Sequence, residues 1–225
     1  MRSPARALVL LALLAPAPAS AAEDGPVILL EVTSRVGPEE APEAAPLRFA
    51  LFEDGQVYVG GARELLAGRV EKQEIKGIES QIERIRKLPG LGSSVVFGPG
   101  PRRARLLVRK GRPLEIVATG DPAAAPPNLR PIAGLVETLG SFSHPTLRPF
   151  RPAVHLARAR EGHLTGGCRP WDDRLPPLPE LLSSPRAVPS ELISGWPTGA
   201  IPASVCAGGK TYVVTFHPLI PGERP

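Results

Sequence analysis

The residues best able to do chemistry in this 225-residue chain stand close together, beside the first of its two cysteines. They are Arg169, Trp171, Asp172 and Asp173, which follow a Gly-Gly-Cys string. Neighbouring carboxylates can hold a cation or serve as an acid and a base. Adjacent side chains normally point apart, however, and such a pair also suits a turn or a contact with Arg174. We therefore keep two interpretations, a binding loop and a compact structural corner.

The two cysteines, Cys168 and Cys206, predict a disulfide, because exported proteins with an even number of cysteines usually pair them. Both cysteines have glycines nearby, so their backbones are free to approach. The bridge would close a loop of about 39 residues and stabilise the fold by about 4 kcal/mol through chain entropy. Bridged cysteines are not free nucleophiles.

The histidines carry no recognisable ligand motif, since no two of them stand at metal-ligand spacing on one predicted element. They are His144, His155, His163 and His217. A serine-hydrolase elbow and a phosphate-binding loop in its strand–turn–helix context are also missing from the sequence. We expect no metal and no cofactor. Whether the protein is an enzyme stays open, because a hydrolase could use Asp172, Asp173 and one of His155, His163 or His217.

A second group of charged residues clusters around one predicted turn: Arg102, Arg103, Arg105, Arg109, Lys110 and Arg112. One interpretation is the solvated face and turn of a hairpin. The other is an anion-binding patch for acidic envelope polymers or a partner protein. The net charge of the whole chain is only +5, and this modest excess predicts no nucleic-acid partner.

The first 22 residues have the pattern of a secretory signal peptide. Arg2 and Arg6 precede an apolar run over residues 7–15, and small residues surround a cleavage site after Ala21 or Ala22. The run is shorter than the roughly 20 apolar residues that span a membrane. We therefore expect an exported protein, periplasmic or extracellular, that does not span a membrane after cleavage.

Hydrophobic periodicity and turn residues divide residues 26–160 into strands and helices. A strand is predicted at residues 27–32, and hairpins surround Asp54-Gly55 and Lys110-Gly111. Isoleucines at three- and four-residue steps predict a helix that ends before Pro89-Gly90. A second helix is expected to be capped by Asn128, with Pro131 in its first turn. A further strand over residues 150–160 is expected to extend the sheet.

This order predicts an α+β fold, an antiparallel sheet of hairpins with two amphipathic helices on one face. Residues 161–225 differ in composition and hold many of the 29 prolines. We expect them to form a disulfide-stapled extension with one late strand at residues 211–216. Because the extension has little apolar material for a separate core, it is expected to wrap the first domain.

Residues 47–142 resemble small uncharacterised exported bacterial proteins, and their layout is similar to that of emfourin, a family of bacterial inhibitors of thermolysin-type metalloproteases. The helix end at Lys87-Leu88-Pro89, the Arg/Lys-Gly hairpin and the segment from Pro126 to Pro131 carry this resemblance. It covers less than half of the chain. The resemblance implies a protease inhibitor, transfers no functional residue, and does not extend to the cysteine-containing tail.

These observations favour a non-catalytic binding or interaction module of the cell envelope, with an envelope or extracellular macromolecule as its partner. The prediction rests on the signal peptide, the cysteine pair, the basic hairpin and the missing catalytic motifs. A secreted protease inhibitor and the hydrolase described above are the alternatives.

Overall fold

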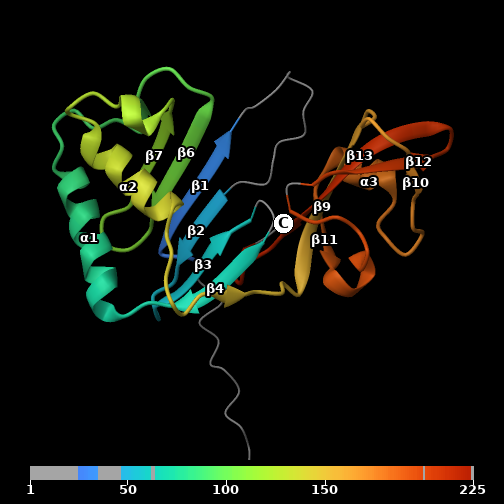
Figure 1. The fold of residues 1–225 in the computed structure, drawn as a ribbon, viewed down its shortest axis with the longest axis horizontal. Coiled ribbons are helices and arrows are strands. Elements are labelled where there is room, and N and C mark those ends of the chain that lie inside the picture. The colour runs from blue at the N-terminus through green and yellow to red at the C-terminus, as the bar shows by residue number, and fades with distance from the viewer. Residues whose placement is uncertain (1–24, 35–46, 62–63, 200, 224–225) are drawn as a thin grey trace, which may run out of the picture.

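The computed structural model describes residues 25–34, 47–61, 64–199 and 201–223, which form two β-sheets (Figure 1). Both sheets are mixed but mostly antiparallel, and the chain is α+β, as the sequence predicts. The predicted signal peptide lies outside the described residues. Within the described ranges, no helix has the length and apolar character needed to cross a membrane.

The first sheet has eight strands in the order β5-β7-β6-β1-β2-β3-β4-β8. Their bounds are β1 (Ile28–Ser34), β2 (Leu47–Leu51), β3 (Gln56–Gly60), β4 (Leu65–Arg69), β5 (Ser94–Val96), β6 (Arg102–Val108), β7 (Leu114–Thr119) and β8 (Arg148–Pro149). Strand β1 pairs with β2 on one side and with β6 on the other, both antiparallel. The N-terminal strand thus joins the two predicted hairpins into one sheet.

Both predicted hairpins are confirmed, and their turns have the expected chemistry. Gly55 has φ 86° and Gly111 has φ 69°, a region of backbone space that glycine enters without steric cost. In the first turn, Oδ1 of Asp54 accepts the backbone N–H of Gln56 at 3.0 Å. The turn chemistry of this sequence therefore fixes strand pairing between β2 and β3 and between β6 and β7.

Helices α1 (Lys72–Arg86) and α2 (Arg130–Gly140) pack on one face of this sheet (Figure 1). The isoleucine stripe of α1 is buried as predicted, and a capping box between Glu71 and Glu74 starts that helix. Pro131 lies in the first turn of α2, as expected. The predicted cap at Asn128 is wrong, because the residue at the N-cap is Leu129, which makes no side-chain cap bond. A 3₁₀ turn, η1 (Pro122–Ala124), precedes this helix.

The opposite face of the first sheet is also partly apolar, and the segment that follows β13 packs against it. Tyr58 and Phe52 are buried there together with Ile220, which comes from the C-terminal segment. Nearby, Arg48 donates to both carboxylate oxygens of Glu223 at 2.8 and 2.9 Å. A hydrophobic contact and an ion pair thus attach residues 220–223 to the face of the sheet that the helices leave uncovered.

The second sheet has five strands in the order β10-β12-β13-β9-β11. Its elements are β9 (Val154–Glu161), β10 (Arg169–Pro170), α3 (Leu178–Ser183), β11 (Arg186–Pro189), the 3₁₀ turn η2 (Ser190–Ile193), β12 (Ala203–Ala207) and β13 (Lys210–Pro218). Its core is a separate cluster of buried side chains that includes Leu181, Val188, Val205, Val214 and Phe216. The C-terminal half therefore has its own sheet and its own hydrophobic core.

Two expectations about this half are wrong. The strand predicted near residues 150–160 forms as β9, but it pairs with β13 and β11 in the second sheet and does not extend the first. The extension also contains four strands of its own and not a single late one. Apart from the late strand at residues 211–216, its apolar residues lie on short elements in proline-rich sequence. The sequence around those elements shows no clear period, although together their apolar residues fill a core.

Candidate functional site

The predicted disulfide between Cys168 and Cys206 is confirmed, with the two Cα atoms 5.5 Å apart. The residues that follow Cys168 form β10, which runs parallel to β12 and pairs Arg169 with Val205 and Pro170 with Cys206. The bridge and this short ladder hold the backbone of the Gly-Gly-Cys string against the second sheet. The side chains that follow are consequently presented from a fixed backbone.

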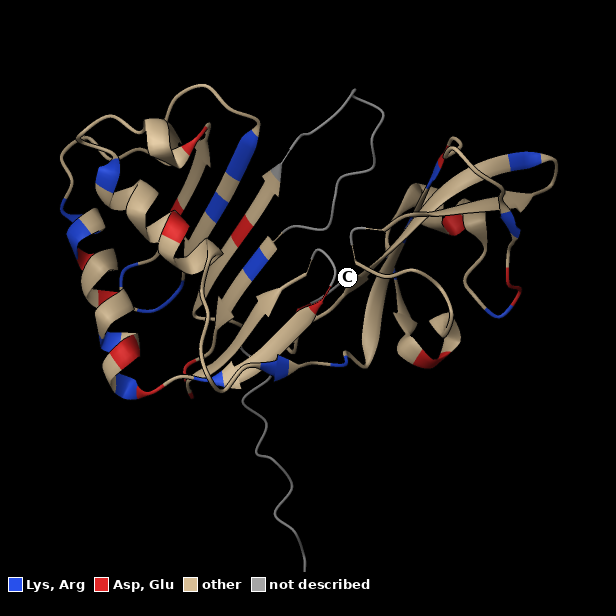
Figure 2. Cartoon of the chain, in the orientation of Figure 1, with Lys and Arg blue, Asp and Glu red and all other residues tan. Residues whose placement is uncertain are grey.

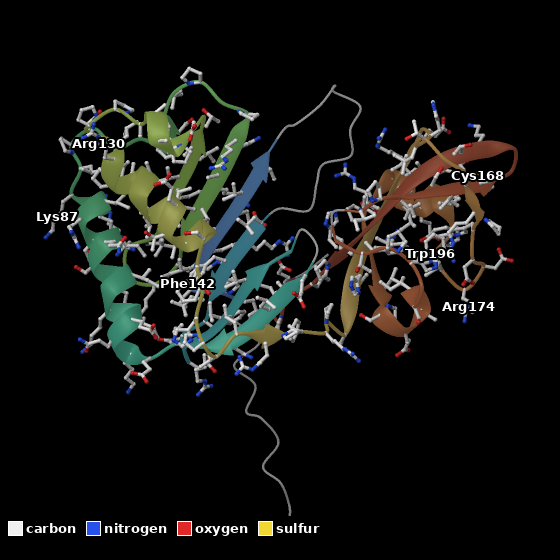
Figure 3. All side chains as sticks on the ribbon, in the orientation of Figure 1. Lys87, Arg130, Phe142, Cys168, Arg174 and Trp196 are labelled. Carbon is white, nitrogen blue, oxygen red and sulfur yellow. A yellow bond between two sulfur atoms is a disulfide. The ribbon has the colours of Figure 1, made fainter. Side chains whose placement is uncertain are left out.

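Arg169 and Trp171 both contact the ring of Trp196, and we call these three residues the Trp corner. Figure 3 labels Trp196 and Cys168 in this half of the molecule. The guanidinium carbon of Arg169 lies 3.8 Å from the centroid of the Trp196 ring. This is a cation–π contact. The Trp171 and Trp196 rings pack edge to face with centroids 5.5 Å apart, and Phe216 contacts Trp196 from the core in the same way.

The Trp corner is buried at its base and open at its edge. Trp196 is only 6% exposed, whereas Arg169 is exposed and Trp171 is half-buried. One N–H of Arg169 donates to the carbonyl oxygen of Gly195 at 3.1 Å, which fixes the guanidinium plane. The indole nitrogen of Trp171 is buried without a hydrogen-bond acceptor among the described residues. The corner therefore combines a rigid cation, an aromatic edge and an unsatisfied donor.

Sequence reasoning placed Arg169 and Trp171 in one loop but did not join Trp196 to them. The signal was present, because the chain has only two tryptophans and both lie between the two cysteines. Because the disulfide closes a loop that contains both tryptophans, a contact between their rings is a reasonable expectation.

The carboxylate pair does not form a joint acid–base site. Asp172 accepts hydrogen bonds from the side chain of Arg174 at 2.6–3.3 Å and from its backbone N–H at 3.0 Å. The hydrogen bonds from Arg174 lower the pKa of Asp172 to about 2. A carboxylate with that pKa is a poor base near neutral pH, and Asp173 is exposed in the turn. The geometry matches the interpretation of a turn with an Arg174 contact.

His155 has a hydrogen-bonding arrangement unlike that of a catalytic base. Oγ of Ser190 donates to the carbonyl oxygen of Pro152 at 2.6 Å, so the proton in its 2.9 Å contact with Nδ1 of His155 comes from the imidazole. A serine nucleophile would instead donate to the histidine. Burial also lowers the pKa of His155, which favours the neutral ring. This histidine holds Ser190 and the start of η2 against β9.

The six basic residues predicted as an anion patch divide into several environments. Arg105 donates to Glu115 at 2.9 Å, and Lys110 forms an ion pair with Glu79 at 2.9 Å, which raises the pKa of Lys110. Arg109 donates to the carbonyl oxygen of Pro26 at 3.0 Å. Figure 2 shows the basic bands of β6 beside an acidic band on β1. Three of the six cations are thus engaged with other parts of the protein.

The remaining three do not converge either. Arg102 and Arg103 are successive residues of β6, so their side chains leave opposite faces of the sheet. Arg112 follows the hairpin turn, where its carbonyl oxygen accepts a hydrogen bond from Arg86 of α1. Among the described residues, no group of three or more His, Cys, Asp or Glu side chains is arranged to hold a metal ion.

No protein-family model, curated protein or solved structure matches this chain. The resemblance to emfourin-type inhibitors stays a prediction.

Proposed function

We propose that this protein is a non-catalytic binding module that acts outside the cytoplasm and recognises a macromolecule through the Trp corner. The observation that carries the proposal is the exposed Arg169 guanidinium, stacked on Trp196 beside Trp171 and held by the Cys168–Cys206 bridge. Tryptophan and arginine are the side chains most enriched among the residues that dominate binding energies in protein interfaces.

Preorganisation strengthens this argument. A disulfide, a parallel ladder and a cation–π stack fix the corner before any partner arrives, so little side-chain entropy remains to be lost on binding. Arg169 keeps further N–H donors beyond the one that Gly195 accepts. A partner that presents a carboxylate or another anionic group beside an apolar surface would match both the guanidinium and the indole edge.

The extracytoplasmic location is part of the proposal. Its support is the signal-peptide pattern of residues 1–22 together with the disulfide, because such bridges persist in oxidising compartments. An acidic envelope polymer or an envelope protein is the class of partner that fits this location.

Cross-linking in the cells that produce the protein tests the proposal. Full-length tagged protein would be cross-linked in living cells, purified, and its partners identified by mass spectrometry. We expect one dominant partner, and we expect it to be lost with Arg169→Lys, which keeps the charge but loses the planar stack. Arg130→Ala is the matched control, since Arg130 is an exposed arginine of the other half (Figure 3).

The outcomes separate the proposals. A partner retained equally by wild-type protein and Arg169→Lys would refute the Trp corner as the binding surface, and an empty lane would refute a macromolecular partner. A thermolysin-type protease in the band would promote the inhibitor hypothesis. In that case the protease would be assayed with an excess of this protein, and full protease activity would exclude the inhibitor hypothesis.

A further inference from the structure

The first half of the molecule contains a cavity of about 580 Å³ between α2 and the sheet. This volume lies within the range of small-molecule sites, about 300–1,000 Å³. Its apolar wall includes Val32, Leu47, Phe97 and Val136, which come from two strands, the residue after β5, and the helix. The cavity lies in the half of the chain that does not contain the Trp corner.

One wall of this cavity includes Gly120, whose backbone lies directly against that of Gly98. Gly120, with φ 97°, lines the cavity, and a Cβ at this position would lie 1.9 Å from the carbonyl oxygen of Gly98. Only glycine permits this close approach. Phe97, next in the chain, is 2% exposed and its backbone N–H donates to the carbonyl oxygen of Thr119. The cavity is therefore part of the folded scaffold.

Two charged residues of opposite sign line the same cavity from different elements. Arg102 starts β6, on the face shared with buried Ala104, and Glu137 lies in the last turn of α2. Figure 2 shows basic bands on β6 and an acidic band on α2. Within the part of the chain that the structure describes, neither residue forms an ion pair. The cavity thus offers a cation on the sheet side and an anion on the helix side.

The helix end increases this polarity. Gly140 and Ser141, where α2 ends, also line the cavity, and the C-terminus of a helix carries partial negative charge. Glu137 and the helix end therefore favour an ammonium group on one side, and Arg102 favours a carboxylate on the other. A ligand with net charge of either sign would be attracted by one side and repelled by the other.

We propose that this cavity binds a short apolar peptide with free termini. The C-terminal carboxylate would pair with Arg102, the ammonium would pair with Glu137 and the end of α2, and the side chains would contact the apolar wall. This site is independent of the Trp corner, so it can succeed or fail whatever the outcome for the macromolecular partner.

Calorimetric titration of the full-length protein with leucyl-leucine tests the proposal. We expect binding, and we expect N-acetylation or C-terminal amidation of the peptide to weaken it about tenfold or more, as loss of a charge-assisted hydrogen bond does. Arg102→Gln should weaken the unblocked peptide by a similar factor and leave the affinity of the amidated peptide unchanged. Glu137→Gln should weaken binding of the unblocked peptide by a similar factor and leave the affinity of the N-acetylated peptide unchanged.

Both variants change exposed side chains, and circular dichroism would verify their folding. Arg130→Ala, an exposed arginine at the start of the same helix, is the control for bulk charge and should leave the affinity unchanged. The proposal is overturned if leucyl-leucine does not bind, if blocked and unblocked peptides bind equally, or if the control weakens binding as much as Arg102→Gln.

Discussion

The disulfide provides the sharpest test of how the C-terminal half is held together. Replacing both cysteines by Cys168→Ser and Cys206→Ser opens a loop with a sequence separation of 38 residues. In the chain-entropy description, a loop of this length contributes about 4 kcal/mol to the free energy of unfolding. The loop contains α3, β11 and η2, with the buried residues Leu181, Val188 and Trp196, so the loss falls on the second core.

Tryptophan fluorescence measures this loss selectively. Both tryptophans of the chain lie between the cysteines, so fluorescence during urea unfolding monitors the C-terminal half. With an m-value of about 2 kcal/mol per M, the midpoint of the fluorescence transition should fall by about 2 M. The core between the helices and the first sheet contains no residue of the loop. The far-UV circular dichroism signal of that half should therefore persist at urea concentrations that unfold the C-terminal half of the variant.

Reduction of the wild-type protein supplies the control. With dithiothreitol present, its fluorescence transition should coincide with that of the double serine variant, which reductant should not affect because the chain has no other cysteines. A shift below about 0.5 M, or about 1 kcal/mol, would refute the reasoning. That result would mean that the second core is stable without the bridge.

Three further predictions concern the contacts that hold the two halves and their strands. Arg48→Ala should lower the free energy of unfolding by about 1.5–3 kcal/mol, because Glu223 loses its charge-assisted hydrogen bonds. A double-mutant cycle with Glu223→Ala, measured by chemical denaturation, should show coupling between the two residues, and additive effects would contradict the ion pair. Because the pKa of His155 is lowered in the folded protein, acidification protonates this imidazole in the unfolded chain before it does so in the folded one. The free energy of unfolding should therefore fall as pH drops below 6.5, by at most about 1.4 kcal/mol per pH unit. His155→Asn should flatten this pH dependence in urea titrations, and an equal slope in both proteins would exclude His155 as its source. Gly120→Ala should lower the melting temperature strongly, because its Cβ would overlap the carbonyl oxygen of Gly98, and an unchanged melting temperature would show that the backbone can separate there.

Local signals in the sequence were sufficient for the individual elements of the first half. Turn residues at Asp54-Gly55 and Lys110-Gly111 determine the two hairpins, and apolar residues at helical spacing determine α1 and α2. Each of these signals lies within one short window, where backbone sterics and burial act on neighbouring residues. The cysteine pair was predictable for a different reason, because two cysteines allow only one intramolecular bridge.

The sequence by itself therefore determined the hairpins, the two helices and the Cys168–Cys206 bridge, whose causes are local or combinatorial. Only the tertiary structure decided that β1 joins the hairpins, that β9 enters a second sheet, and that Trp196 packs under Arg169. Non-local pairing depends on which apolar surfaces meet once every element has formed, and that information is spread over the whole chain. The candidate sites share this origin, since Arg102 and Glu137 are distant in sequence and line the same cavity only because α2 packs on the sheet.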